Sequence, residues 1–207
     1  MTETTPMLSG YQMTKKVYDG SRTLIYKAQR ETDQQRVVIK FLRNEYPSFQ
    51  ELVQFRNQYT IAKNLELEGI IHPYCLDNYR NGYALVMEDV GGISLSDYLH
   101  SKSLPLTAFF EIALAVVKTL EGLYQNRVIH KDIKPHNILI HPKTKQIKLI
   151  DFSISSLLPR ETQEIQSPNV LEGTLAYLSP EQTGRMNRGI DYRTDFYSLG
   201  VTFYELL

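Results

Sequence analysis

The chain has 207 residues, of which 42% are hydrophobic and 22% charged, an ordinary globular composition that suits one domain or two small lobes. Its 23 Lys and Arg residues balance 23 Asp and Glu residues, which excludes a general electrostatic attraction to nucleic acid or to an anionic membrane. The single cysteine, Cys75, excludes an internal disulfide framework and fits a reducing compartment. No signal peptide begins the sequence, and the most apolar stretch, 108–123, is too short to span a bilayer. We therefore expect a cytoplasmic protein without a membrane segment.

The N-terminal part of the sequence predicts three strands followed by a long helix. Turn-like residues separate three β-rich runs, 11–18, 24–30 and 36–42. Ser48 and Glu51 form a capping-box pattern after Pro47, and apolar residues then recur at helical spacing until Gly69.

Two more strands and then a change of character follow. Strands are expected at 75–79 and 83–88, joined by a turn at Asn81-Gly82, and Gly91-Gly92 marks a hinge. Helices are then expected near 95–99, near 107–125 and from Thr194 onward. The helix at 107–125 is apolar almost all round, which predicts that it lies inside a helical lobe. The fold class is therefore α+β, with a five-stranded antiparallel lobe carrying one helix and a mainly helical second lobe.

The middle of the chain carries a pattern typical of a metal and phosphate site. The runs 138–140 and 147–150 predict an antiparallel hairpin, which brings Asn137 and Asp151 together at its open end. A carboxylate and an amide oxygen, supplemented by phosphate oxygens, suit Mg²⁺. Just upstream, Asp132 is placed to accept a hydroxyl proton and Lys134 to neutralise a transferring phosphoryl group. Each residue alone is more often a turn or surface residue, but the whole spacing favours phosphoryl transfer.

Several segments in the same order resemble the protein kinase family. The segments are His130-Lys131-Asp132 with Lys134 and Asn137, Asp151-Phe152-Ser153, Val38-Ile39-Lys40, Gly173–Glu181 and Asp195 with Ser198-Leu199-Gly200. Lys134 follows the serine/threonine rather than the tyrosine pattern. The resemblance implies a eukaryotic-like serine/threonine protein kinase domain with the two-lobed kinase fold, in which residues 1–90 are the N-lobe and 91–207 the C-lobe. The run from Glu172 to Leu207, including 182–188, resembles the kinase domain at the front of large bacterial two-component sensor proteins, which implies downstream sensor and histidine-kinase domains as partners.

The resemblance also implies roles for individual residues. ATP would lie between the lobes, with Lys40 on the α- and β-phosphates, Asn137 and Asp151 on Mg²⁺, and Asp132 and Lys134 at the hydroxyl of a protein substrate. The remaining nucleotide contacts would come from Gly20, Ile25, Val38, Met87, Glu88, Val90 and Leu139. Plain core positions are the alternative for the apolar members of this set. Thr174 would contact Asp132 and Lys134.

Four departures from the family pattern bear on activity. The glycine-rich loop keeps only Gly20 of three glycines, and Gln58 stands where the helix should offer Lys40 a glutamate. Ser153 replaces a glycine, and Lys131 replaces an arginine. Because no catalytic oxygen or lysine is lost, we expect an activity that is damped rather than absent.

Two other functions stay open, and the end of the chain raises a separate expectation. A nucleotide-binding pseudokinase is favoured by Gln58 and the eroded loop, whereas the segment 173–181 argues against a kinase of small molecules. The chain stops inside the anchoring helix, so we expect an incomplete C-lobe, a fragment of a longer protein, and poor solubility of this chain alone.

Overall fold

The computed structural model describes residues 5–100, 104–158, 174–184 and 189–207. These residues form two compact units. The first unit runs up to Lys63 and resumes at Ile71–Val90, and the second comprises Asn64–Ile70 and the chain from Gly91 onward. A short segment of the first half of the chain therefore belongs to the second unit.

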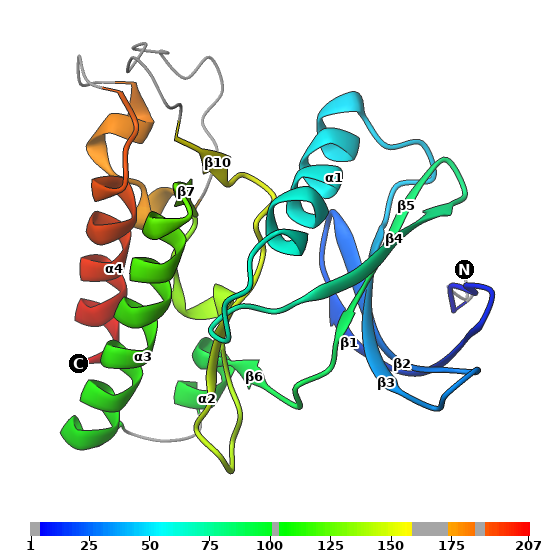
Figure 1. Cartoon of the computed structure of the whole chain (residues 1–207), viewed down its shortest axis with the longest axis horizontal. Coiled ribbons are helices and arrows are strands. Elements are labelled where there is room, and N and C mark those ends of the chain that lie inside the picture. Colours follow the sequence, from blue (N-terminus) through cyan, green and yellow to red (C-terminus); the bar gives the residue numbers. More distant parts are fainter. Residues whose placement is uncertain (1–4, 101–103, 159–173, 185–188) are drawn as a thin grey trace. The chain divides into compact units, whose positions relative to one another are not determined.

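The first unit is built on one antiparallel sheet of five strands in the order β1-β2-β3-β5-β4 (Figure 1). The strands are β1 (Tyr11–Asp19), β2 (Thr23–Arg30), β3 (Arg36–Leu42), β4 (Pro73–Tyr79) and β5 (Gly82–Glu88). Buried residues of β2, β3 and β5 form the core on one face, among them Val37, Ile39 and Phe41. The five strands that the sequence predicts are confirmed.

The helix of the first unit, α1 (Phe49–Lys63), begins as the sequence predicts and ends earlier. Glu51 accepts the backbone N–H of Ser48 at 2.8 Å, and the Glu51 N–H donates to the Ser48 hydroxyl at 3.2 Å, which confirms the capping box. The expected end near Gly69 is wrong. The helix ends at Lys63, and the residues that follow, Asn64–Ile70, belong to the second unit, where a Cβ at Gly69 would lie 1.9 Å from the Thr119 Oγ1.

The hairpin between β4 and β5 forms one residue earlier than the sequence predicts. Tyr79 pairs with Gly82, so the two-residue loop is Arg80-Asn81 rather than Asn81-Gly82. Arg80 adopts a positive φ of 50°, and the Asn81 amide donates to the Glu45 carbonyl at 3.0 Å. The register of β4 on β5 therefore overrides the local preference of the Asn-Gly pair for the turn.

The second unit combines helices with two small sheets, ordered β6-β8-β9 and β10-β7. Its elements are β6 (Ile93–Ser94), α2 (Leu95–His100), α3 (Leu106–Gln125), β7 (Val128–Ile129), β8 (Ile138–Ile140), β9 (Ile147–Leu149), β10 (Ser156–Leu157), α4 (Arg193–Leu206) and the 3₁₀ turns Pro135–Asn137, Leu175–Tyr177 and Pro180–Thr183. The helices α3 and α4 lie side by side (Figure 1), with the rings of Phe109 and Phe203 5.4 Å apart. The helices and the hairpin that the sequence predicts for this part are confirmed.

The long helix α3 belongs to the helical unit, but the prediction that it lies inside that unit is wrong for one of its faces. Phe109, Ile112 and Val116 are buried, but Phe110 and Leu114 are 55% and 70% exposed. Within the described ranges, α3 packs against α4, β7 and β9, which cover one side of the helix only. Its apolar content therefore exceeds what these neighbours bury.

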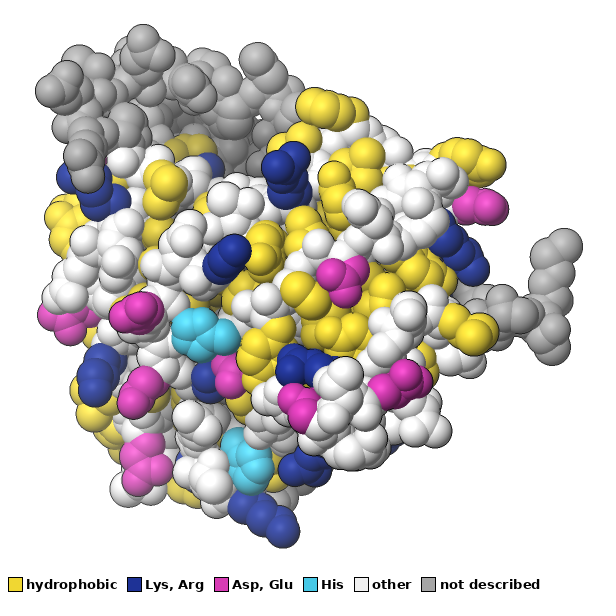
Figure 2. All heavy atoms as spheres, turned by 45° about the vertical axis from the view of Figure 1, so that its right-hand side comes forward, with side chains coloured by type: hydrophobic (Ala, Val, Ile, Leu, Met, Phe, Trp, Pro, Cys, Tyr) yellow, Lys and Arg dark blue, Asp and Glu magenta, His cyan; other side chains and the backbone are white. Residues whose placement is uncertain are grey.

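The surface agrees with the balanced charge of the sequence. On the face drawn in Figure 2, Lys and Arg side chains are interspersed with Asp and Glu side chains. None of the helices in the described ranges combines the length and apolar character that a membrane span requires.

Candidate active site

One face of the sheet in the first unit gathers Lys40 with apolar side chains. Lys40 pairs with Ile25 on β2 and with Leu85 on β5, and Val38 pairs with Met87. Because side chains alternate along a strand, all five lie on the face opposite the core. Ile25 and Val38 are only half-buried, whereas the neighbouring Val37 and Ile39 are fully buried. Neither residue is fully buried, in contrast to the core on the opposite face of the sheet.

The ammonium of Lys40 is held by a neutral partner. Its Nζ donates to the Gln58 Oε1 at 2.9 Å, and the two residues are 7% and 5% exposed. The Gln58 amide also donates to the Met87 sulfur at 3.9 Å, and the Phe55 ring centroid lies 5.8 Å from the Lys40 Nζ. The contact between Gln58 and Lys40 that the spacing predicts is confirmed. Glu51 caps the N-terminal end of α1. There it accepts the Ser48 N–H, which lowers the pKa of the Glu51 carboxyl.

In the second unit, the hairpin of β8 and β9 brings two candidate metal ligands to one end. Ile138 pairs with Leu149, and the Ile150 N–H donates to the Asn137 carbonyl at 3.0 Å. Asn137 directly precedes the first strand, and Asp151 closely follows the second. Asp151 has a φ of 67°, and its Oδ1 accepts the Ser153 N–H at 3.4 Å. The open end of the hairpin therefore carries both oxygen-bearing side chains, as the sequence predicts.

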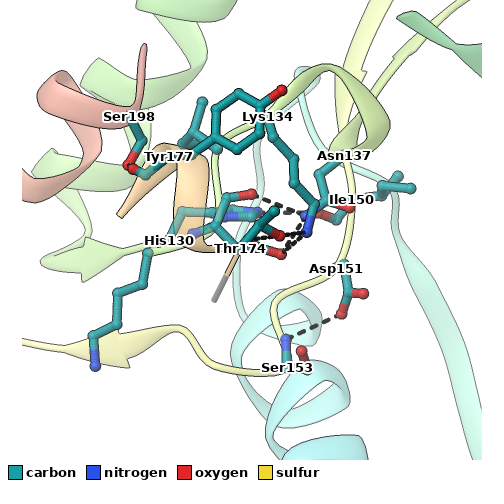
Figure 3. Close-up of polar contacts among 12 residues, drawn as sticks. His130, Lys134, Asn137, Ile150, Asp151, Ser153, Thr174, Tyr177 and Ser198 are labelled. Atoms are coloured by element: carbon teal, nitrogen blue, oxygen red, sulfur yellow. Dashed lines mark hydrogen bonds and ion pairs between the residues drawn. The ribbon is translucent and has the colours of Figure 1, made fainter. Parts of the chain in front are cut away.

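Lys134, Asn137 and Thr174 lie close together (Figure 3). All three contact the Asp132 carboxylate. The Asp132 Oδ2 accepts from the Lys134 Nζ and from the Asn137 amide, both at 2.7 Å, and Asn137 also donates to the Asp132 carbonyl at 2.9 Å. The Thr174 hydroxyl donates to the Asp132 Oδ1 at 3.3 Å and accepts from the Lys134 Nζ at 2.5 Å. The carboxylate is thus fixed in place by one cation and two neutral groups, from residues up to 42 positions apart.

The backbone of the loop before Asp132 is anchored by a buried carboxylate of α4. Asp195 is 4% exposed and accepts the N–H groups of His130 and Lys131 at 2.8 and 2.7 Å. These bonds hold Lys131 in the left-handed region, with a φ of 70°, and Gln182 donates to the Lys131 carbonyl at 3.0 Å. Burial raises the pKa of Asp195, and the two backbone donors and His130 oppose that rise.

The His130 ring stabilises the same loop through two hydrogen bonds. Its Nε2 lies 3.0 Å from the Ile150 carbonyl, and its Nδ1 accepts the Asp132 N–H at 3.3 Å. A carbonyl requires a donor, so these partners assign the proton to Nε2. The His130 ring also packs against Phe152 with the centroids 4.9 Å apart, which ties the loop to the residue after Asp151.

The chemistry of these side chains fits a magnesium ion. Both N–H groups of the Asn137 amide point at Asp132, so the amide oxygen is the atom that could ligate a metal. The described part of the chain contains no group of three or more His, Cys, Asp and Glu side chains arranged for a metal. A site with Asn137 and Asp151 as its protein ligands would need further oxygens from water or phosphate, which is the usual way that Mg²⁺ binds.

The segment after Thr174 is fastened to α4. Ser198 donates to the Tyr177 carbonyl at 2.8 Å, and the Tyr177 hydroxyl donates to the Glu205 carboxylate. Burial and Glu205 raise the pKa of Tyr177 to about 12. Thr194 donates to Glu181 at 2.8 Å. Gly173, the first residue of the predicted docking motif, lies outside the described residues.

A family model for the protein kinase domain matches residues 11–207. The chain belongs to the protein kinase family. Its two-lobed α+β fold is therefore that of a protein kinase domain, as the sequence predicts.

Bacterial serine/threonine-protein kinases are among its relatives. The chain is 34% identical over 202 residues to the serine/threonine-protein kinase PrkC of Bacillus subtilis, covering 95% of this chain and 30% of that protein. It is 35% identical over 184 residues to PknB of Mycobacterium leprae, covering 83% of this chain and 28% of that protein. A probable serine/threonine-protein kinase of Clostridium perfringens is 32% identical over 199 residues, with 95% and 28% covered. The chain thus spans less than a third of the length of these relatives.

The sequence did not indicate every kinase-site contact. Gln182, which holds the Lys131 carbonyl, carried no signal, because a lone glutamine after a Ser-Pro-Glu run has no spacing that predicts a backbone partner. The partner of Glu181 was also missed. Only the fold brings Thr194 of α4 to its carboxylate.

Proposed function

We propose that this chain is the catalytic domain of a serine/threonine protein kinase, which transfers the γ-phosphoryl group of ATP to a serine or threonine hydroxyl. One observation carries the proposal: the Asp132 carboxylate is held at once by Lys134, Asn137 and Thr174. A surface aspartate would need no such arrangement. The names of the bacterial relatives support the same reaction and the same class of acceptor.

The residues at Asp132 suit an in-line displacement on phosphorus. Asp132 accepts the proton of the acceptor hydroxyl, the new bond forms between that oxygen and the γ-phosphorus, and the bond to the bridging oxygen of ADP breaks. Lys134 offsets negative charge on the transferring group, because its ammonium already lies 2.7 Å from the carboxylate that receives the proton. The Thr174 hydroxyl holds both groups in place, because it contacts the Asp132 carboxylate and the Lys134 ammonium.

The residues that would bind the nucleotide are a further part of the proposal. We propose that Lys40 binds the α- and β-phosphates, and that Asn137 and Asp151 hold Mg²⁺, which neutralises phosphate charge when bound. The other proposed nucleotide contacts are Gly20, Ile25, Val38, Met87, Glu88, Val90 and Leu139. The partial exposure of Ile25, Val38 and Leu139 supports this part of the proposal, since Val38 and Leu139 each lie between two buried neighbours along their strands.

Replacement of the proposed base tests the reaction. The intact protein is incubated with labelled ATP, Mg²⁺ and a protein acceptor, beside its Asp132→Asn variant. We expect the variant to label the acceptor about 10²- to 10⁴-fold more slowly, the usual contribution of a positioned general base. Asp97→Asn makes the same chemical change at an exposed position of α2 and should leave the rate unchanged. Equal labelling by wild type and Asp132→Asn would refute the proposal.

A nucleotide-binding pseudokinase is the second candidate, because Lys40 has the neutral Gln58 as its hydrogen-bond partner. This function predicts that the protein binds ATP tightly but transfers no phosphoryl group, and that Gln58→Glu does not restore transfer. Transfer by the wild-type protein would exclude it.

The setting of the domain is a further part of the proposal. The resemblance of 182–188 to bacterial sensor proteins supports a cytoplasmic signalling module with sensor and histidine-kinase domains as partners. The reading frame of the full gene tests this directly. A frame without such segments would contradict the sensor role and leave the kinase proposal intact.

A further inference from the structure

The turn between β1 and β2 is held by side chains rather than left to glycine. It spans Asp19 to Thr23, contains a single glycine, and is closed by a bond of 3.0 Å from the Gly20 N–H to the Thr23 carbonyl. In this family the corresponding glycine-rich loop covers the phosphates of the nucleotide. The loss of two glycines therefore raises the question of what shapes this turn.

Arg43, directly after β3, contacts the turn at three points. Its N–H donates to the Arg22 carbonyl at 2.9 Å, and its Nε donates to the Gly20 carbonyl at 2.8 Å. Its guanidinium also forms an ion pair with the Asp19 carboxylate. The second oxygen of that carboxylate accepts from the Lys16 Nζ at 2.5 Å. Arg43 thus links one side chain and two carbonyls of the turn to the end of β3.

The remaining glycine is explained by Tyr18 on the same turn. A Cβ at Gly20 would lie 2.4 Å from the Tyr18 Cε1, well inside van der Waals contact. The aromatic ring therefore lies against the Gly20 backbone and occupies the space that a side chain would need. With only one glycine left, this turn has less backbone freedom than a glycine-rich loop. The contacts of Arg43 and Tyr18 restrict its conformation further.

We propose that Arg43 is a positioning residue for the phosphates of the bound nucleotide, acting through Asp19 and the Gly20 carbonyl on the backbone of residues 20–22. The inference rests on the proposed nucleotide-binding function. A guanidinium reaches the carbonyl and the carboxylate at the same time, which a lysine ammonium at the end of a flexible stem does not. Arg43 and Asp19 are 32% and 39% exposed, so their pair contributes little to global stability. The effect falls on the shape of the turn.

Nucleotide binding to the intact protein tests this without any phosphoryl transfer. Calorimetry with ATP and with adenosine, both with Mg²⁺, separates contacts to the phosphates from contacts to the base and sugar. We expect Arg43→Ala to weaken ATP binding about 3- to 10-fold, the range of one or two partly exposed charged contacts, and to leave adenosine binding unchanged. Asp19→Ala should have a similar effect, and the double variant should lose little more. Arg43→Lys should restore only part of the affinity.

A control variant and a set of contradicting results complete the test. Arg36→Ala removes an exposed arginine at the other end of β3 and should change neither affinity. Unchanged ATP binding in Arg43→Ala, an equal loss for ATP and adenosine, or full additivity of the two alanine variants would each overturn the inference. So would a wild-type protein that binds ATP no more tightly than adenosine. A protein that shows the expected binding pattern but transfers no phosphoryl group refutes the kinase proposal alone.

Discussion

Asp132 and Lys40 are the two charged groups on which the proposed chemistry depends most, and their surroundings differ. Asp132, in the second unit, is contacted by a lysine, an amide and a hydroxyl, on a loop whose backbone is held by the buried Asp195. Lys40, in the first unit, donates to the neutral Gln58. In the same unit the turn between β1 and β2 is held by the partly exposed Arg43.

The difference separates two tasks of one enzyme. The groups that would handle the acceptor hydroxyl keep every side chain and contact that the chemistry needs. Of the four departures, Gln58 and the loss of glycines around Gly20 lie in the first unit, whereas Lys131 and Ser153 lie in the second and leave Asp132, Lys134 and Asn137 in place. Changes in the second unit should therefore abolish transfer, whereas changes in the first unit should tune it in either direction.

The largest effect is expected at the anchor of the catalytic loop. Asp195→Ala leaves the buried N–H groups of His130 and Lys131 without their acceptor, at a cost of roughly 2–5 kcal/mol for two unsatisfied donors. Chemical denaturation should show this loss of unfolding free energy, and kcat should fall at least about 100-fold because Asp132 is displaced. Ser198→Ala, on the same helix, removes one neutral hydrogen bond and should cost only about 1 kcal/mol. Wild-type stability and kcat in Asp195→Ala would contradict the anchoring role.

The next effect is expected at Thr174. Thr174→Val keeps the shape of the side chain and removes the hydroxyl that contacts both Asp132 and Lys134. Loss of a hydrogen bond to charged groups, worth about 1.5–3 kcal/mol, should lower kcat roughly 10- to 100-fold. Thr174→Ser should restore most of the rate, and Thr183→Val, at an exposed hydroxyl nearby, should leave it unchanged. Steady-state kinetics with a protein acceptor measures all three, and a valine variant as active as the serine variant would count against the contact.

A gain rather than a loss is expected in the first unit. Gln58→Glu gives the Lys40 ammonium a charged partner at the position of the present 2.9 Å contact. A hydrogen bond between charged groups is stronger than a neutral one by about 1–2 kcal/mol. If this difference acts on the positioning of Lys40 in the transition state, kcat/KM for ATP should rise about tenfold. Gln50→Glu makes the same chemical change at an exposed position of α1 and should have no such effect. A lower kcat/KM in Gln58→Glu would show that the desolvation penalty of the buried carboxylate exceeds the stabilisation by the ion pair.

Several elements of the two sites could be predicted from the sequence, because patterns of neighbouring residues specify them. The hairpin of β8 and β9 and the capping box of α1 depend on neighbouring residues, and both form where the pattern indicates. The pairing of Gln58 with Lys40 followed from a known spacing in the family. The roles of the individual site residues stay predictions until they are measured.

Long-range packing explains what the sequence did not reveal. The residues directly after α1 belong to the second unit, where Gly69 packs against Thr119, a residue far along the chain. Which face of α3 is exposed depends on the elements that pack against the helix, and the apolar composition of the helix alone does not specify these elements. The contact of Arg43 with the Gly20 carbonyl requires the register of three strands, so a single arginine after β3 gave no indication of it.

The smallest effect is expected at the start of α1 and depends on pH. The Ser48 N–H lowers the pKa of the Glu51 carboxyl below its ordinary value of 4.5, so the unfolded chain binds the proton more tightly than the folded one. The contribution of the carboxylate is therefore fully present above pH 4.5 and is lost as the pH falls through the pKa of the folded state. Glu51→Gln should cost about 1 kcal/mol of unfolding free energy at pH 7 and progressively less below pH 4. Denaturation of both proteins across this range, with the exposed Glu66→Gln as control, measures the difference; a cost that stays constant with pH would mean that the carboxylate charge plays no part in the cap.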